Sequence, residues 1–417
     1  MGQRNEELLA QAREAAPLTA RRGEEGLLLA KAQGCRVYDA DNVAYIDLVG
    51  GGGANLLGYS NQYLMDAVRR AAALGLASGF HAAAEVELVQ LLIEQVPHLA
   101  SWVLTASESE AWQLILRWSR RDTGRDRIVV FDGNRRGGVE GFHVAAGPPG
   151  VTQPLVAGIP AELAQLVKVA PWGDTEAFTN LLGDVGSEIA AVVLDPIAAQ
   201  FGVIAPSEEF LRTVASSTRA AGARLILDET LTGFRLARGG AGEAFGVTPD
   251  AAVFGGALGG GVARIGAVAV ARTTGAAPLD EVPEPPPPIA VLAAIATLSV
   301  LRNESVHQRL EERGAQLQAG IESLAERYGR PLRCSRIGSV FVCYFSRQPV
   351  TDGDSFARVD QETWARFSRA ARDSGVLLPS RSPVTCFLSH AHGVKDVEQA
   401  LAAMDAALKK LQKDDEA

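Results

Sequence analysis

The sequence has 417 residues, of which 47% are hydrophobic and 21% charged, and its formal net charge is −9. This composition excludes a disordered, collagenous or coiled-coil chain, and the acidic balance argues against a nucleic-acid partner, which selects a basic face. The four widely spaced cysteines predict neither a zinc site nor a disulfide framework. No apolar run reaches the roughly 18–20 residues of a membrane span, and the polar start lacks the apolar core of a signal peptide, so we expect a cytoplasmic protein without a membrane partner.

The first two thirds of the sequence alternate between strand and helix patterns. Residues 35–49 alternate in polarity on both sides of a turn at 39–42, which predicts a β-hairpin. A helical pattern over 64–92 is interrupted near the glycines at 75–79. Short apolar runs then alternate with helical stretches, with strands expected at 102–105, 127–131, 190–195, 224–228 and 251–254, and helices at 109–121 and 208–221. This alternation predicts an α/β fold with a mostly parallel sheet, whose ligands bind beyond the carboxyl ends of the strands.

The proline-rich stretch at 281–288 marks a boundary, because proline removes a hydrogen-bond donor and fixes φ. Beyond it the patterns predict a long helical stretch over 289–328, a strand at 340–345, a helix at 361–373, a short strand at 384–388 and a last helix at 394–411. We therefore expect an N-terminal arm of residues 1–60, a large α/β domain of residues 61–300 and a small α+β C-terminal domain of residues 301–417.

One predicted strand ends in two carboxylates, Asp228 and Glu229. An aspartate at the carboxyl end of a parallel strand can pair with a protonated ring nitrogen of a ligand. It can equally well cap a helix or join an ion pair, and both interpretations stay open. The glycine runs at 51–53 and 259–261 fit neither G-x-G-x-x-G nor a P-loop, so they favour close backbone packing over nucleotide binding.

The segment LILDETLTGFRLARGGAGEAFGVTPD at 225–250 resembles class III, fold type I aminotransferases, most closely glutamate-1-semialdehyde aminomutase. Further ordered matches are YIDLVGGGGANLLGYS at 45–60, IAAVVLDPIAAQFGV at 189–203, RIGSVFVCYF at 336–345 and FLSHAH at 387–392. The resemblance implies a large domain with a mainly parallel sheet, a small domain, a homodimer and a small-molecule substrate. It also implies pyridoxal phosphate (PLP), held by a Schiff base to a lysine.

Four positions depart from the cofactor site that this resemblance implies. The lysine's place falls on Gly256, and the ring-stacking tyrosine and the partner's phosphate-binding threonine fall on Arg135 and Pro283. The phosphate-binding Ser-Gly-Thr run becomes Ser107-Glu108-Ser109, and two like charges ~4 Å apart repel by roughly 4 kcal/mol at an effective dielectric of about 20. We therefore expect a degenerate site with no cofactor, where PLP or pyridoxamine phosphate (PMP) could bind only non-covalently.

The remaining candidates also have two interpretations each. His81 is either a general base or a structural histidine. Lys31, which stands where the aminomutase carries a carboxylate-binding arginine, is either an anion anchor or a surface lysine. Arg135 and Arg136 either bind an anion or are solvated. The predicted catalytic residues are Asp228, Glu108 and His81, and the predicted substrate residues are Lys31, Ser78, Arg135, Arg136 and Gln200; no metal site is expected.

Three functions are compatible with these residues. The leading hypothesis is an enzyme that reuses the cleft, without PLP, for another reaction on a small polar or carboxylate substrate, in specialised-metabolite biosynthesis. The second is a non-catalytic pseudoenzyme that binds an active aminotransferase. The third is an enzyme that uses PLP or PMP without a covalent link.

Overall fold

The computed structural model describes residues 2–15, 27–74, 83–133, 138–148, 150–272, 283–303, 305–382 and 384–416. The chain divides into two compact units. The terminal unit consists of Met1–Gln62, Ala199–Val203 and Ser305–Ala417. The sheet unit consists of Tyr63–Ala198 and Ile204–Glu304.

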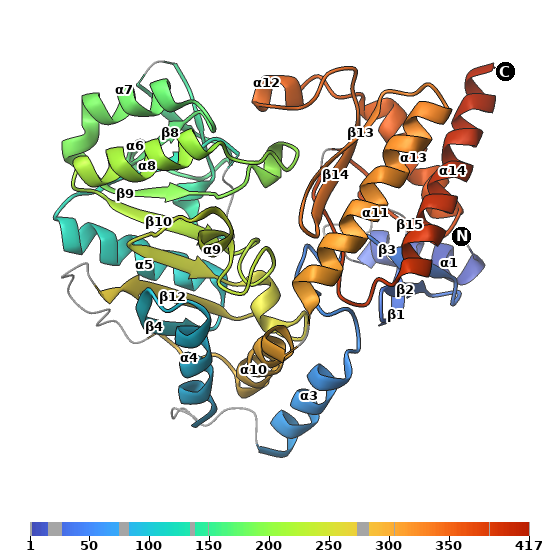
Figure 1. The fold of residues 1–417 in the computed structure, drawn as a ribbon, viewed down its shortest axis with the longest axis horizontal. Helices are drawn as coiled ribbons and strands as arrows, with labels where there is room; N and C mark the ends of the chain where they lie inside the picture. The colour runs from blue at the N-terminus through green and yellow to red at the C-terminus, as the bar shows by residue number, and fades with distance from the viewer. Residues whose placement is uncertain are drawn as a thin grey trace. The chain divides into compact units, whose positions relative to one another are not determined.

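A seven-stranded sheet organises the sheet unit (Figure 1). Its strands, in spatial order, are β4 (Leu99–Thr105), β12 (Gly266–Ala271), β11 (Ala251–Phe254), β10 (Arg224–Glu229), β9 (Ile189–Leu194), β5 (Arg127–Phe131) and β8 (Val167–Ala170). Neighbours from β11 to β8 pair in parallel, whereas β12 is antiparallel to both β11 and β4. The predicted α/β fold with a mostly parallel sheet is therefore confirmed.

Helices precede, connect and follow these strands along the chain. They are α3 (Gln62–Leu74), α4 (Ala83–Gln95), α5 (Glu108–Thr123), α6 (Ala161–Gln165), α7 (Thr175–Val185), α8 (Glu208–Ala220), α9 (Ala241–Phe245) and α10 (Pro288–Asn303), with a small hairpin of β6 (Val144–Ala146) and β7 (Thr152–Pro154). Helix α5 has defined ends: the Ser107 hydroxyl accepts a hydrogen bond from the Glu110 amide, and Gly124 closes the helix at φ 66°.

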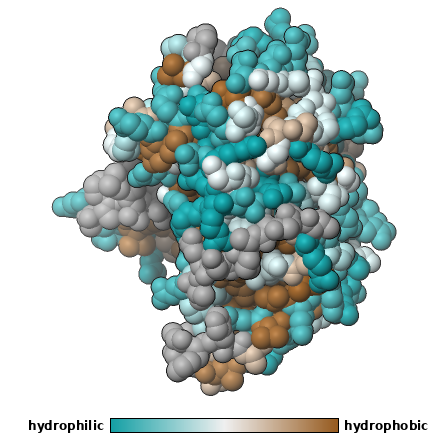
Figure 2. Space-filling model, turned by 90° about the vertical axis from the view of Figure 1, so that its left-hand side faces the viewer, coloured by the Kyte–Doolittle hydropathy of each residue, from teal (hydrophilic) through white to brown (hydrophobic). Residues whose placement is uncertain are grey.

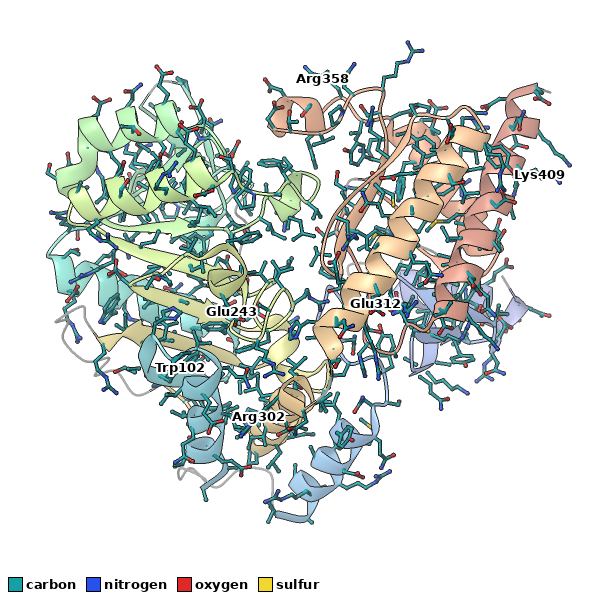
Figure 3. All side chains as sticks on the ribbon, in the orientation of Figure 1. Trp102, Glu243, Arg302, Glu312, Arg358 and Lys409 are labelled. Atoms are coloured by element: carbon teal, nitrogen blue, oxygen red, sulfur yellow. The ribbon has the colours of Figure 1, made fainter. Side chains whose placement is uncertain are left out.

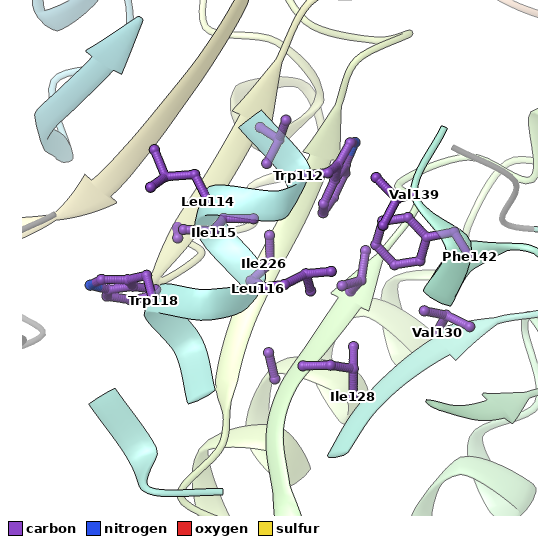
Figure 4. Packing of buried hydrophobic residues seen from close by; sticks show 14 of the residues in the cluster. Trp112, Leu114, Ile115, Leu116, Trp118, Ile128, Val130, Val139, Phe142 and Ile226 are labelled. Carbon is purple, nitrogen blue, oxygen red and sulfur yellow. The ribbon is translucent and has the colours of Figure 1, made fainter. Parts of the chain in front are cut away.

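The core of the sheet unit lies between α5 and the sheet (Figure 4). Trp112, Ile115 and Trp118 recur along one face of α5 at helical spacing and are buried. They belong to the same cluster as Ile128 and Ile226 from the strands. This packing fixes the start of α5 relative to the carboxyl ends of the strands, where the candidate site lies.

The terminal unit contains two smaller sheets. The first has the order β1 (Leu29–Gln33), β2 (Arg36–Asp39), β3 (Ala44–Asp47), β15 (Val376–Leu377), and the second has the order β13 (Leu332–Ile337), β14 (Val340–Phe345), β16 (Cys386–Phe387). The helices are α1 (Gln3–Ala15), α11 (Val306–Arg327), α12 (Gly353–Phe356), α13 (Gln361–Asp373) and α14 (Val394–Glu416). The hairpin predicted around residues 39–42 is present as β2 and β3, with Asn42 at φ 65° in its turn.

The helical stretch predicted over 289–328 is two helices rather than one. Helix α10 ends at Asn303 and α11 begins at Val306, after Ser305. Asn and Ser are poor helix-interior residues because their side chains compete for nearby backbone groups, which favours a break at this point.

Polar side chains dominate the face shown in Figure 2, where apolar residues form separate spots. Among the described residues no single helix is long and apolar enough to cross a membrane, and α10 and α11 meet that test only when taken together.

Candidate functional site

The candidate site in the sheet unit starts from two neighbouring strands that end together. Strands β10 and β11 are parallel, with Asp228 opposite Val253 and Glu229 opposite Phe254. The residues that follow each strand, Thr230 and Gly255, therefore emerge at the same edge of the sheet. Phe254 packs at this edge against Trp102 of β4, which Figure 3 labels, with ring centroids 5.2 Å apart.

Asp228 is buried, with 1% of its surface exposed, and its orientation is fixed locally. Its Oδ1 accepts hydrogen bonds from the Thr230 amide at 2.9 Å and from the Thr230 hydroxyl at 2.6 Å. This is the geometry of an Asx turn, in which an aspartate binds the backbone two residues on. The turn holds a carboxylate at the carboxyl end of β10.

Gly256 lies beside this turn in a backbone conformation that excludes a side chain. Its φ of 48° falls in the left-handed region, and a Cβ atom there would overlap the carbonyl oxygen of Thr230. Most residues avoid this region because Cβ meets the following carbonyl. The position where the resemblance implies a lysine therefore has neither an amine nor room for one in this conformation.

The side chain of Glu108, the first residue of α5, contacts the glycine turn that follows β11. Its Oε1 accepts a hydrogen bond from the Gly256 amide. The Glu108 side chain also fills the space that a Cβ at Gly255 would need. A half-buried carboxylate and a two-glycine turn thus pack together, and the Glu108 side chain fits because Gly255 has no side chain.

The two serines at the start of α5 bind groups of the protein itself. The Ser107 hydroxyl accepts from the Glu110 amide at 3.3 Å, and the Ser109 hydroxyl accepts from the Gly138 amide at 3.0 Å. The Glu110 carboxylate in turn accepts from the Ala106 amide at 3.0 Å. These bonds order the helix start, whose dipole favours an anion.

Glu229 follows Asp228 as the last residue of β10, and its side chain connects this strand to α9. It is buried and accepts hydrogen bonds from the Thr232 hydroxyl at 2.6 Å and from the amides of Ala241 and Gly242 at 3.0 and 2.8 Å. The pKa of Glu229 is raised to about 7, because burial and the nearby Asp228 charge outweigh the lowering effect of these donors. Glu229 therefore titrates near neutral pH.

The other predicted site residues lie elsewhere or outside the described residues. Lys31 is an exposed residue of β1 in the terminal unit, with its Nζ 4.4 Å from the centroid of the Tyr38 ring. Gln200 is exposed in the same unit, and Pro283 is half-buried ahead of α10 in the sheet unit. His81, Ser78, Arg135 and Arg136 lie outside the residues that the structure describes.

The structure thus brings together Asp228, Glu108 and Gly256 and adds Thr230, which sequence reasoning missed. The Asp-x-Thr spacing was an available signal for Thr230, because it is typical of an Asx turn. The bond between Glu108 and Gly256 had no such signal, since the two residues are 148 positions apart.

Comparisons with known proteins show the family of the chain. The family model Aminotransferase class-III matches residues 19–410. Glutamate-1-semialdehyde 2,1-aminomutases from Thermomicrobium roseum and Aquifex aeolicus are 35% and 34% identical, each over 93% of this chain and over 91% and 93% of their own lengths. An omega-transaminase from Sphaerobacter thermophilus has a TM-score of 0.87 at 27% identity, with 97% of each chain covered.

Two further solved structures, which show likeness of fold, are described with a cofactor. One is a transaminase with PLP bound, with a TM-score of 0.87 at 21% identity and 100% of each chain covered. The other is a lysine-to-alanine variant of the Pseudomonas aeruginosa PAO1 glutamate-1-semialdehyde aminomutase in complex with PMP, with a TM-score of 0.84 at 24% identity and 98% and 96% of the chains covered. These relatives and neighbours point to PLP or PMP as the cofactor, so the expectation that none is used was wrong.

The described residues fit such a cofactor if it is held without a covalent bond. Asp228 is the buried acceptor that a protonated pyridine nitrogen requires, and Thr230 keeps it in place. Gly256 supplies no amine for a covalent link, and its conformation leaves no space for a longer side chain.

Proposed function

The chain belongs to the class-III aminotransferase family, and from that premise we propose that it is a glutamate-1-semialdehyde aminomutase-like enzyme that holds PLP or PMP non-covalently. The observation that carries the proposal is the pairing of a buried, oriented Asp228 with a Gly256 whose backbone excludes a side chain. The aminomutase variant that lost a lysine and is described in complex with PMP supports this mode of binding.

Each of the protein's own groups has a separate role in this proposal. When bound, the cofactor would supply an electron sink for a developing carbanion. Asp228 holds a negative charge for the ring nitrogen, and the Asx turn with Thr230 prevents it from rotating away. The amides at the start of α5 present partial positive charge to the phosphate.

Glu108 is the proposed proton carrier in place of the lysine. Its Oε1 accepts a hydrogen bond from the Gly256 amide, so a carboxylate lies beside the position where the resemblance implies an amine. A carboxylate can accept and return a proton, but it cannot form the covalent link that a lysine forms with an aldehyde. We therefore propose a reaction other than lysine-dependent transamination.

The substrate class that we propose is a small polar or carboxylate compound, as the family resemblance implies. Lys31, Ser78, Arg135, Arg136 and Gln200 stay predictions as substrate residues, and His81 stays a prediction as a second proton carrier. We also propose that the functional form is a homodimer, as the resemblance implies.

Equilibrium dialysis of the full chain against PMP tests the proposal. We expect reversible binding, and at least ~10-fold weaker binding for Asp228→Asn, because one lost charge-assisted hydrogen bond is worth about 1.5–3 kcal/mol. Asp250→Asn is the matched control, since Asp250 binds the Leu225 amide at the opposite end of the same strands. If the wild type binds no PMP, or if the two variants bind equally well, the proposal is wrong.

A further inference from the structure

Three of the four cysteines lie on one small sheet of the terminal unit. Cys334 is on β13, Cys343 on β14 and Cys386 on β16, in that spatial order, and all three are buried free thiols. Cys334 and Cys343 are direct cross-strand partners, whereas Cys386 is the partner of Phe341. The aminotransferase site described above lies in the other unit and uses none of these thiols.

The register places Cys334 and Cys343 where two side chains approach most closely. The Ser346 amide donates to the Pro331 carbonyl at 2.9 Å, which makes that pair hydrogen-bonded. Hydrogen-bonded and non-hydrogen-bonded pairs alternate along an antiparallel ladder, so three residues further along, Cys334 and Cys343 form a non-hydrogen-bonded pair. The Cα atoms of such a pair are about 4.5 Å apart, within the roughly 4.4–6.8 Å that a disulfide spans.

Cys334 lies nearer to solvent than Cys343 does. Cys334 lines a cavity of about 640 Å³ at the junction of α11 and the edge strand β13. It is 9% exposed, whereas Cys343 is 1% exposed. A reagent that enters the cavity therefore meets Cys334 first, with Cys343 behind it.

The cavity is lined by three arginines and one acidic residue, Glu322. The Arg333 guanidinium donates to the main-chain carbonyls of Ser346 and Arg347, at 3.0 and 2.8 Å, so its acceptors there are neutral. Arg347 is exposed, and Arg330 pairs with Asp415 at 2.6 Å. The excess of positive charge favours anionic reagents at the Cys334 thiol.

We propose that Cys334 is a thiol-exchange site for anionic low-molecular-mass disulfides, with Cys343 as the resolving cysteine. The Cys334 thiolate attacks one sulfur of the small disulfide, forms a mixed disulfide and releases one small thiolate. The Cys343 sulfur, after losing its proton, then attacks the Cys334 sulfur, closes the Cys334–Cys343 disulfide and releases the second small thiolate. Two protein thiols are oxidised, one small disulfide is reduced to two thiols, and the two protons go to the released thiolates.

The electrostatics of the pair agree with this order of events. The hydrogen bond with Cys334 raises the pKa of Cys343, and burial raises it further. Cys343 therefore keeps its proton while the thiol at the cavity reacts.

The test treats the native full chain with oxidised glutathione, which carries carboxylates, and separately with cystamine, which is cationic. Intact mass and peptide mapping should show a Cys334–Cys343 disulfide that forms at least ~10-fold faster with oxidised glutathione, and added salt should reduce this difference. Cys343→Ala should stop at a mixed disulfide on Cys334, and Cys334→Ala should leave Cys343 unmodified.

Cys386→Ala is the control for removing a buried sulfur from the same sheet, and it should react like the wild type. Near-ultraviolet circular dichroism compares the folding of all three variants. Peptide mapping of the wild type tests the proposal even if a variant does not fold. Equal rates with the two disulfides would overturn the role of the arginines. A disulfide that involves Cys386, or no modification of Cys334 in the native protein, would overturn the proposal itself.

Discussion

At the scale of single residues, Gly256 determines what the site can hold. Gly256 has no amine where the resemblance implies a lysine, and its backbone adopts a left-handed conformation against the Thr230 carbonyl. Glu108 accepts a hydrogen bond from the Gly256 amide. Gly256 contacts both Thr230 and Glu108, so a longer side chain at Gly256 should require changes in both neighbours.

Gly256→Lys should therefore neither restore transamination nor fold as stably as the wild type. The left-handed φ and the overlap with Thr230 should together lower the free energy of unfolding by ~1–3 kcal/mol, as measured by urea unfolding. Gly124→Ala is the matched control, because Gly124 has φ 66° but no atom within 4 Å of its added Cβ. A stable Gly256→Lys protein that transaminates glutamate-1-semialdehyde would contradict this account.

The charge of Glu108 should weaken phosphate binding at the start of α5. Glu108→Gln removes a negative charge close to the main-chain amides at the start of α5. The affinity for PMP should therefore rise at least ~10-fold, because like charges ~4 Å apart repel by roughly 4 kcal/mol. The affinity for pyridoxamine, which lacks the phosphate, should change far less.

Glu110→Gln is the control for this effect, because the Glu110 carboxylate lies in the same helical turn but binds the Ala106 amide. An equal gain in PMP affinity for both variants would show that only the net charge matters. Unchanged affinity in Glu108→Gln would place Glu108 away from the phosphate.

At the scale of elements, Glu229 joins strand β10 to helix α9 and makes that connection sensitive to pH. Its pKa rises from an ordinary value of 4.5 to about 7 in the folded protein. The folded state therefore binds this proton more tightly than the unfolded state does. The resulting stability is fully present below about pH 4.5 and is lost as the pH rises through 7.

Glu229→Gln should accordingly flatten the dependence of stability on pH. Between pH 5 and pH 8 the wild type should lose up to roughly 3 kcal/mol through this group, as measured by urea midpoints, and the variant should lose less. Glu243→Gln serves as the control, since the exposed Glu243 binds the Gly239 amide in the same connection. Parallel pH profiles for wild type and Glu229→Gln would contradict the assignment.

The elements that the sequence predicted well are those with strong periodic patterns. Strands β5 and β11 and helix α13 have the predicted bounds, because apolar runs and helical spacing determine them locally. Strand β13 was missed because its sequence, LRCSRI, carries two arginines, and it forms through its pairing with β14. The sequence singles out Asp228 and Gly256 of the candidate site, but the contact between Glu108 and Gly256 depends on the tertiary fold.

At the scale of the whole molecule, the family resemblance implies a homodimer. Several large apolar side chains are exposed in the described chain, including Val151, Leu155 and Val156 at 44–49%. Exposed apolar surface is expected where a protein associates. Native mass spectrometry should therefore show twice the chain mass of 43.9 kDa at micromolar concentration. A monomer under these conditions would contradict the proposed dimer.

We propose that the site binds its cofactor without a covalent bond, and reduction with borohydride distinguishes this mode of binding from a Schiff base. The full chain is incubated with PLP, one half is reduced with borohydride, and both halves are measured by native and denaturing mass spectrometry. We predict one PLP per chain in the native spectrum of the unreduced half, and no PLP on peptides of the sheet unit when the reduced half is digested and mapped. A borohydride-stable adduct on a lysine of that unit, or no PLP in the native spectrum, would contradict the account.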